Sequence, residues 1–240
     1  MNTEKNIKMT IVFDNNKYNS SLETGWGFSC FVKGLEKTIL FDTGSDGRIL
    51  LSNMEKLNID PKEIDVIFIS HDHWDHTGGL EKLLQINPNV QIFILDAFSK
   101  ETKTKIENFQ VSLINLKLSK EIFEGVYSTG ELGTGIKEQS LVIKSNNGLI
   151  VITGCAHPGI VNILEEVKNI FKEKIHLVVG GFHLKDFSKS DIEEIIMKVK
   201  KFGAIKVAPT HCSGDLARDL FKANFKNNFI EIGAGSEIEI

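Results

Sequence analysis

Cysteine is scarce in this 240-residue chain, and its few cysteines are poorly placed for cross-linking. The three residues, Cys30, Cys155 and Cys212, are odd in number, far apart and outside any C-x-x-C pair. This count and this spacing exclude a disulfide framework and a four-cysteine zinc site.

Long apolar runs are also missing. No stretch approaches the roughly 20 apolar residues that cross a bilayer. Residues 1–9 are polar and lack the apolar stretch of a secretory signal. From these two observations we expect a cytoplasmic protein that does not act at a membrane.

Neither sign of charge dominates the chain. The 28 Lys and Arg residues against 32 Asp and Glu residues give a net charge of −4, which does not indicate a nucleic-acid partner. A small molecule is the expected ligand. Because Arg48 and Arg218 are the only arginines, a bound phosphate would depend on lysines, backbone N–H groups and metal rather than on a guanidinium fork.

The overall composition is that of an ordinary globular protein. Hydrophobic residues make up 41% and charged residues 25% of the chain, which excludes a disordered or coiled-coil protein. The length allows one or two domains. Because we find no internal repeat and no linker rich in proline or serine, we expect one domain over residues 1–240.

The first half begins with short β-rich runs and continues with alternating helices and strands. The expected strands are 7–13, 27–33, 37–41, 66–70 and 90–95, and the expected helices are 49–57 and 80–86. This order predicts a sheet that opens with antiparallel strands and continues in βαβ units.

The second half repeats that order. We expect short strands between about residues 100 and 144, at 111–118, 122–127 and 139–143, where a second sheet begins. Further strands at 149–153, 175–179, 205–208 and within 229–240 alternate with helices at 160–171, 190–201 and 216–221. The sequence therefore predicts an α/β fold of two mixed sheets packed face to face, with helices outside.

Histidine carries the strongest functional signal. Six of the seven histidines follow predicted strands or lie in glycine-rich turns: His71, His73, His76, His157, His183 and His211. Loops at the carboxyl ends of strands are where an α/β scaffold presents reactive side chains. The seventh, His176, lies inside a predicted strand, where we expect it to pack.

The segment SHDHWDHTGG predicts a metal site. While the backbone stays extended, His71 and His73 project to one side, and a turn directly afterwards brings Asp75 and His76 to the same point. Imidazole and carboxylate ligands suit zinc, iron or manganese better than calcium. One short motif cannot complete two metal sites, so we expect distant histidines to contribute. The alternative is a set of surface histidines with no ligand role.

These motifs resemble a known family. HDHWDH resembles the H-x-H-x-D-H signature of the metallo-β-lactamase fold, and FDTG, GCAHPG and PTHC occur in the matching order. The further segments WGFS, TGCAHPGI, GGFHL, PTHCSG and GAGSEI resemble the subgroup of 7,8-dihydropterin-6-methyl-4-(β-D-ribofuranosyl)aminobenzene 5′-phosphate synthases. The resemblance covers nearly the whole chain and implies an αββα sandwich.

The resemblance also implies a ligand set for two divalent transition metals, with zinc expected and iron, manganese or magnesium as alternatives. His71 and His73 would hold the first metal, and Asp75 and His76 the second. His211 would supply the far ligand of the second metal, and His157 would complete the first.

Two departures from the common pattern concern the ligand set. Many hydrolases of this superfamily have another histidine after the first motif and then a Gly-Asp whose carboxylate bridges the metals. Here no histidine lies between His76 and His157, and Gly154-Cys155 stands where Gly-Asp is expected. Either Cys155 replaces the bridging carboxylate, or His157 takes over a ligand position and only solvent bridges the metals, with Cys155 near the ligands but not on the metal. A third alternative is that Cys155 is a buried structural thiol. We assign the ligand role to His157.

Two further residues have more than one possible role. Asp42 either accepts a hydrogen bond from a ligand histidine, as carboxylates near metal sites do, or caps the turn before the next helix. His183 is a candidate metal ligand, catalytic acid or base, or phosphate contact. Asp75 is also a catalytic candidate, because it would orient the attacking group.

Candidate substrate contacts are aromatic. Trp26 and Phe28 would stack on a flat heterocycle such as a pterin, or else pack in the core or at its rim. Trp74 would shape the substrate pocket from within the segment SHDHWDHTGG, residues 70–79, called the metal loop below. The glycine-rich turn 129–135 would offer backbone N–H groups to a phosphate, or else simply connect two strands.

Three functions remain open at this stage. The subgroup resemblance implies a transferase that joins a dihydropterin-methyl diphosphate to a ribofuranosylaminobenzene phosphate. The superfamily resemblance equally allows a hydrolase of a phosphoester, lactone or thioester. A metal-holding protein that binds its ligand without turnover is the non-enzymatic alternative. Nothing in the chain indicates an oligomeric state.

Overall fold

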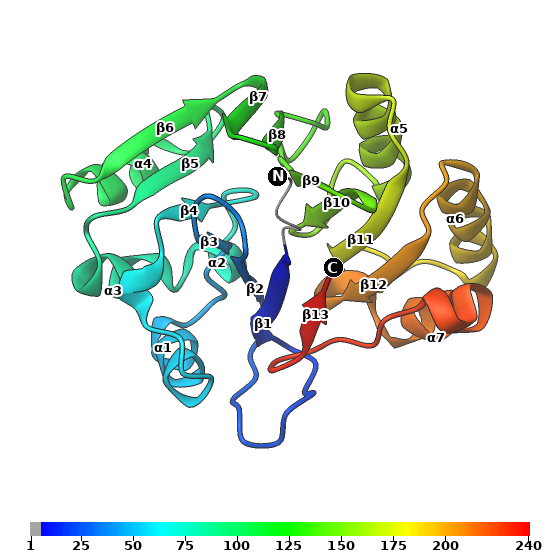
Figure 1. The fold of residues 1–240 in the computed structure, drawn as a ribbon, viewed down its shortest axis with the longest axis horizontal. Coiled ribbons are helices and arrows are strands. Elements are labelled where there is room, and N and C mark those ends of the chain that lie inside the picture. Colours follow the sequence, from blue (N-terminus) through cyan, green and yellow to red (C-terminus); the bar gives the residue numbers. More distant parts are fainter. Residues whose placement is uncertain (1–5) are drawn as a thin grey trace. The chain divides into compact units, whose positions relative to one another are not determined.

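The computed structural model describes residues 6–240. It divides into two compact units, one formed by the chain up to Lys117 together with Gly233–Ile240, and the other by Leu118–Ile232. Each unit has its own mixed sheet and its own helices (Figure 1). The α/β class with two mixed sheets flanked by helices is therefore confirmed. A single domain over the whole chain stays a prediction.

The sheet of the first unit has seven strands in the order β13-β1-β2-β3-β4-β5-β6. Their bounds are β1 Lys8–Asp14, β2 Phe28–Lys33, β3 Ile39–Phe41, β4 Val66–Phe68, β5 Gln91–Leu95, β6 Ser112–Leu116 and β13 Glu237–Glu239. Neighbours from β13 to β3 are antiparallel, and those from β3 to β6 are parallel. The parallel strands thus present their carboxyl ends at one edge of the sheet.

The helices of this unit are α1 Gly47–Lys56, α2 Trp74–Thr77, α3 Leu80–Ile86 and α4 Lys100–Glu107, with a short 3-10 turn, η1, at Pro61–Glu63. The helix α1 begins at Asp46, whose carboxylate accepts the backbone N–H of Arg48 at 2.7 Å. Such a cap satisfies a helix donor that would otherwise lack a partner.

The helix α4 corrects the expectation of strands from about residue 100. Ser99 caps it by accepting the backbone N–H of Thr102, and Glu101 pairs with Lys105 one turn later. Its only buried residue is Ile106. A helix with one buried side chain has no apolar periodicity, so the sequence pattern did not predict a helix here.

The second unit has six strands in the order β12-β11-β10-β9-β8-β7. Their bounds are β7 Leu118–Phe123, β8 Val126–Gly130, β9 Leu141–Ser145, β10 Gly148–Thr153, β11 Ile175–Gly181 and β12 Lys206–Thr210. Strands β7 to β10 are antiparallel neighbours, whereas β10, β11 and β12 run parallel.

Three sequence predictions differ from the structure near the start of this sheet. The expected strand 122–127 is interrupted by a tight turn at Gly125, which has a φ of +78° and connects β7 to β8. The expected strand 111–118 belongs to the first sheet, because β6 pairs with β5, and the second sheet begins only at β7. The turn expected at 129–135 starts later, since Thr129 and Gly130 still belong to β8.

Three helices, α5 Ile160–Phe171, α6 Lys189–Lys201 and α7 Asp215–Phe225, lie along one face of strands β10 to β12 (Figure 1). Their inward residues, including Ile163, Ile196 and Phe221, form one buried cluster with Val151 and Val178 of the strands. Burying each such side chain contributes about 1.5–3 kcal/mol. Short 3-10 turns follow β12 at His211–Ser213 (η2) and α7 at Lys226–Asn228 (η3).

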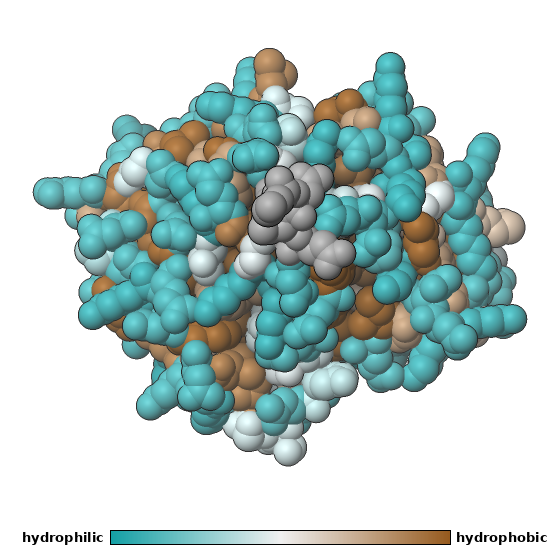
Figure 2. All heavy atoms as spheres, viewed as in Figure 1, coloured by the Kyte–Doolittle hydropathy of each residue, from teal (hydrophilic) through white to brown (hydrophobic). Residues whose placement is uncertain are grey.

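Hydrophilic side chains cover most of the face seen in Figure 2, and apolar residues interrupt them in separate patches. Among residues 6–240, each helix is too short or too polar to cross a membrane.

Candidate metal centre

The first unit carries a cluster of histidines at the carboxyl end of β4. His71 and His73 follow this strand in a segment that bends at His71 and Asp72, and Asp75 and His76 lie in the short helix α2 that begins directly after His73. His71, Asp75 and His76 are buried, whereas His73 is half-buried. The expected turn is present as α2, but the backbone before it bends at His71 and Asp72 rather than staying extended.

His71 and His73 approach each other closely. The Nε2 atom of His71 lies 3.1 Å from the Nδ1 atom of His73. Two nitrogens bound to the same tetrahedral zinc at about 2.05 Å would lie about 3.3 Å apart. This pair therefore already has the separation of two ligands on one ion.

Asp75 and His76 form a second pair. The Oδ2 atom of Asp75 lies 3.6 Å from the Nε2 atom of His76. The ring of His76 is also close to that of His71, with centroids 4.2 Å apart. The four side chains of the motif thus form two adjacent pairs of donor atoms.

Asp42 lies beneath both pairs. Its Oδ2 atom is 2.6 Å from Nδ1 of His76 and accepts a hydrogen bond from the hydroxyl of Ser70 at 2.7 Å, while its Oδ1 atom accepts the backbone N–H of Ser70. Its φ of +54° is rare for a residue other than glycine, and such strain is common at functional sites. Asp42 therefore contacts a candidate ligand as well as ending the turn after β3.

These contacts assign the protons on two histidine rings. The hydroxyl of Ser70 has one proton, which it donates to Asp42, so it accepts a proton from Nδ1 of His71 at 2.9 Å. His76 likewise donates its Nδ1 proton to Asp42. Both rings then present an unprotonated Nε2 atom, which is the form that binds a metal ion.

Two glycines fit the metal loop against the turn after β3. A Cβ atom on Gly78 would lie 2.2 Å from the backbone oxygen of Ser45, and one on Gly79 would lie 2.3 Å from that of Thr43. The same turn binds the loop directly, because the backbone N–H of Thr43 donates to the carbonyl of His76 at 2.8 Å.

The second unit carries its own cluster at the carboxyl ends of its parallel strands. Cys155 and His157 follow β10, His183 follows β11, and His211 and Cys212 follow β12. The Sγ atom of Cys155 lies 3.4 Å from Nε2 of His211, and the rings of His157 and His183 have centroids 4.4 Å apart. The predicted residues of this half of the chain are thus brought together within their own unit.

Glu138 organises the loop after β10, and the sequence analysis missed it. Its Oε1 atom accepts the backbone N–H groups of Gly154, Cys155 and Ala156 at 2.8–3.1 Å, and its Oε2 atom accepts that of His157 at 2.8 Å. The carboxylate is buried and lies 16 to 19 residues before its partners in the chain. No local pattern of residue types predicts such a contact, because the partners are backbone groups of a distant segment.

The environment of Cys212 favours a thiolate. Burial raises the pKa of this thiol, but hydrogen bonds with Cys155 and His183 and the charges of His211 and His183 lower it more, so that it lies well below the ordinary value. The hydrogen bond with Cys212 in turn raises the pKa of His183 against the effect of its partial desolvation. Burial raises the pKa of Cys30, which lies in β2 of the first unit.

The candidate aromatic contacts differ in exposure. Trp26 is 38% and Trp74 64% exposed, whereas Phe28 is fully buried in β2, with its ring 6.1 Å from that of Phe41. The prediction that Phe28 stacks on a substrate is therefore wrong, because its ring is part of the core.

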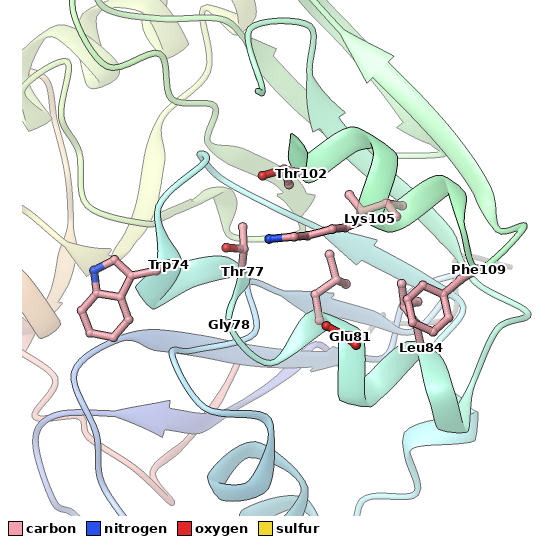
Figure 3. Close-up of a pocket in the computed structure, with 10 residues that line it drawn as sticks. Trp74, Thr77, Gly78, Glu81, Leu84, Thr102, Lys105 and Phe109 are labelled. Atoms are coloured by element: carbon pink, nitrogen blue, oxygen red, sulfur yellow. The ribbon is translucent and has the colours of Figure 1, made fainter. Parts of the chain in front are cut away.

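Trp74 stands at one end of a pocket of about 270 Å³ in the first unit. Thr77, Lys105 and Phe109 follow along the pocket, which ends against Leu84 (Figure 3). In the second unit, Gly133, Thr134 and Gly135 of the glycine-rich turn line another pocket together with His157.

Comparison with known proteins identifies the family. Residues 27–109 match the family model of the metallo-beta-lactamase superfamily. The chain is 32% identical to a 7,8-dihydropterin-6-methyl-4-(beta-D-ribofuranosyl)-aminobenzene-5'-phosphate synthase of Methanocaldococcus jannaschii, over 98% of this chain and 97% of the relative. A metal-dependent hydrolase of Saccharolobus solfataricus is 28% identical over 74% of this chain and 76% of its own length.

A crystal structure described as a metal-dependent hydrolase of the beta-lactamase superfamily is similar with a TM-score of 0.82, at 30% identity over 98% of this chain and 99% of that one. The YhfI protein of Bacillus subtilis, a metallo-beta-lactamase fold protein, has a TM-score of 0.69 at 17% identity, over 98% of this chain and 100% of that chain, and supports the fold alone. The chain therefore belongs to the metallo-β-lactamase superfamily of metal-dependent enzymes.

Proposed function

We propose that the histidine clusters of the two units form one dinuclear metal centre, and that this enzyme uses it to join a dihydropterin-methyl diphosphate to a ribofuranosylaminobenzene phosphate. The observation that carries the proposal is the pairing of His71 with His73 and of Asp75 with His76 above Asp42. The proposal includes the packing of the two sheets face to face as one domain, which the family resemblance implies.

In this centre His71, His73 and His157 would hold one metal, and Asp75, His76 and His211 would hold the other. Neutral imidazoles with one carboxylate form a donor set that suits zinc, with iron and manganese as alternatives. The donor atoms fit this use. Ser70 contacts Nδ1 of His71 and Asp42 contacts Nδ1 of His76, so the unprotonated Nε2 atom of each ring stays available to a metal. Cys155 would stand beside His211 as a supporting contact.

The reaction forms one carbon–nitrogen bond and breaks one carbon–oxygen bond. The nitrogen of the arylamine attacks the methylene carbon of the pterin, the diphosphate leaves, and the amine proton passes to a base. When bound, divalent cations supply the positive charge that stabilises a diphosphate leaving group. We assign the base to Asp75, whose carboxylate lies beside His76 in the buried part of the loop.

The exposed tryptophans suit the pterin. Trp26 and Trp74 are the candidate residues with ring surface open to solvent, and a flat bicyclic ring can stack on such a surface. The phosphates would rely on lysines and backbone N–H groups, since both arginines are engaged elsewhere: Arg48 pairs with Glu23, and Arg218 donates to the carbonyl of Ile232. A cytoplasmic location and a proton-transfer role for His183 stay predictions.

A hydrolase is the second candidate, because a solved structure described as a metal-dependent hydrolase is 30% identical over nearly the whole chain. In that case water replaces the arylamine as the attacking group, and Asp75 would orient the water. The substrate would be a phosphoester, lactone or thioester.

One assay separates the two functions. The purified protein is incubated with the pterin diphosphate, with and without the arylamine phosphate, and diphosphate release is measured. A transferase releases diphosphate only when the arylamine is present and forms the coupled product. A hydrolase that acts on this diphosphate releases it without the amine, and a hydrolase of a lactone or thioester releases none. The His71→Ala/His73→Ala variant should lose either activity. Failure of the wild-type protein to couple the two substrates would contradict the proposed transferase.

A further inference from the structure

Three soft donor side chains occupy equivalent places in the second sheet. Cys155, His183 and Cys212 are each the second residue after a strand, following β10, β11 and β12 in that order. These three strands are parallel neighbours, with Thr153 paired to Gly180 and Gly181 paired to Thr210. Because the three strands end within one residue of the same level, their following loops start side by side at the edge of the sheet.

The donor atoms are close enough to share an ion. One donor atom each from Cys155, His183 and Cys212 lies within 4.8 Å of the other two. Around a tetrahedral zinc, two sulfurs lie about 3.8 Å apart, and a sulfur and a nitrogen about 3.6 Å apart. Shifts of about 1 Å in side-chain position would therefore bring the three donors to the distances of ligands on one ion.

The backbone leaves room for these thiols. A Cβ atom on Gly181 would lie 2.6 Å from Sγ of Cys212 and 3.2 Å from Cα of Cys155. The neighbouring turn is fixed from the other side, since the hydroxyl of Ser213 accepts the backbone N–H of Phe182 at 3.0 Å. A glycine at this position is thus required by the approach of the two cysteine-bearing loops.

Burial distinguishes the two kinds of donor. Cys155 and Cys212 are buried, whereas His183 is exposed. An ion can therefore reach the site from the side of His183 and be held on its inner side by sulfur. Two thiolates and one imidazole suit soft or borderline cations such as Zn²⁺ and do not suit Mg²⁺ or Ca²⁺.

We propose that Cys155, His183 and Cys212 form a thiolate-rich binding site for a soft transition-metal cation, complete within the second unit. The site is additional to the histidine and aspartate donors of the proposed dinuclear centre, and it does not depend on the proposed function. On binding, two S–H bonds are replaced by two metal–sulfur bonds, and both protons go to the buffer. Of the roles open to His183, this proposal assigns metal binding.

Titration of the metal-free protein with Co²⁺ alone tests the site, because bonds between thiolates and Co²⁺ give charge-transfer absorption in the near ultraviolet. At saturation, the wild-type protein should show the absorption of one thiolate-bound Co²⁺ ion per chain, whatever further Co²⁺ its histidines bind. The Cys212→Ser and His183→Gln variants should bind Co²⁺ at least about tenfold more weakly in this assay, as a site does when it loses a ligand. The Cys155→Ser variant should lose intensity in the same way.

Two controls locate the absorption. The Cys30→Ser variant removes the third cysteine of the chain, a buried thiol in β2, and should leave the spectrum unchanged. The His71→Ala/His73→Ala variant disables the histidine pair of the first unit and should retain the thiolate band. Far-ultraviolet circular dichroism of each variant checks that it is folded.

X-ray absorption of the wild-type complex gives a measurement that needs no variant, and it should show two sulfur neighbours at about 2.3 Å. Absence of thiolate absorption in the wild-type protein would overturn the proposal. So would a band that persists unchanged in Cys212→Ser, or one that is lost in His71→Ala/His73→Ala.

Discussion

Oδ2 of Asp42 lies 2.6 Å from Nδ1 of His76, in a buried contact between residues 34 positions apart in the chain. The same oxygen accepts the hydroxyl of Ser70, which contacts Nδ1 of His71. One carboxylate thus orients a histidine of each donor pair. Loss of Asp42 should therefore affect both metals of the proposed centre rather than one.

Replacing this carboxylate tests that relationship. We expect Asp42→Ala to weaken zinc affinity by about 10 to 100-fold, because the rings of His71 and His76 lose the contacts that fix their protonation and orientation. Competition with a chromophoric chelator measures the affinity. Asp46→Ala is the matched control, since Asp46 caps α1 and should cost about 1 kcal/mol of stability with no change in zinc affinity. Equal zinc affinity in Asp42→Ala and wild type would remove Asp42 from the site.

Glu138 should be essential for the stability of the second unit. In Glu138→Ala, four backbone N–H groups after β10 lose their acceptor, and each buried donor left without one costs about 1–3 kcal/mol. We expect the free energy of unfolding, measured with urea, to fall by at least about 3 kcal/mol. Glu124→Ala, at an exposed position, should change it by less than about 0.5 kcal/mol. A similar small change in both variants would show that Glu138 does not organise this loop.

Two glycines provide a paired test of the metal loop. Gly78→Ala places a Cβ atom against the backbone of Ser45, which cannot move like a flexible side chain, so we expect a loss of about 1–3 kcal/mol in stability. Gly135→Ala meets nothing within 4 Å and should be nearly neutral. Thermal unfolding followed by circular dichroism compares the two. The account of loop packing fails if Gly78→Ala is as stable as Gly135→Ala.

Trp74 and Phe28 should respond in opposite ways to truncation. Trp74→Ala removes an exposed ring and should raise the KM for the pterin substrate while changing stability by less than about 0.5 kcal/mol. Phe28→Ala empties a core position and should cost about 3–5 kcal/mol. Steady-state kinetics and urea unfolding measure the two effects. An unchanged KM in Trp74→Ala would argue against its contact with the pterin.

Elements with strong apolar periodicity could be predicted from the sequence. The helices 80–86 and 160–171 have the expected bounds, because each buries a regular stripe of leucine, isoleucine or valine. The polar helix α4 buries only Ile106 and was missed. The turn at Gly125 was missed for a different reason: the residues around it have β-type side chains on both sides of the turn.

Some features of the candidate site could likewise be predicted from the sequence, and others could not. The spacing in HDHWDH is local, so the two donor pairs could be predicted, although the backbone bends at His71 and Asp72 rather than staying extended. Glu138 contacts backbone groups 16 to 19 residues later, and such contacts cannot be predicted from residue types because every residue has a backbone. The grouping of Cys155, His183 and Cys212 depends on the register of β10, β11 and β12, which could not be predicted from the pattern of residue types.

The most direct measurement for the central claim is the position of zinc in crystals of the metal-loaded protein, located by anomalous scattering at the zinc absorption edge. The account predicts one ion within about 2.1 Å of Nε2 of His71, Nδ1 of His73 and a ring nitrogen of His157, and a second bound by Asp75, His76 and His211. Zinc bound only by residues of the first unit, with His157 and His211 contributing no ligand, would contradict it.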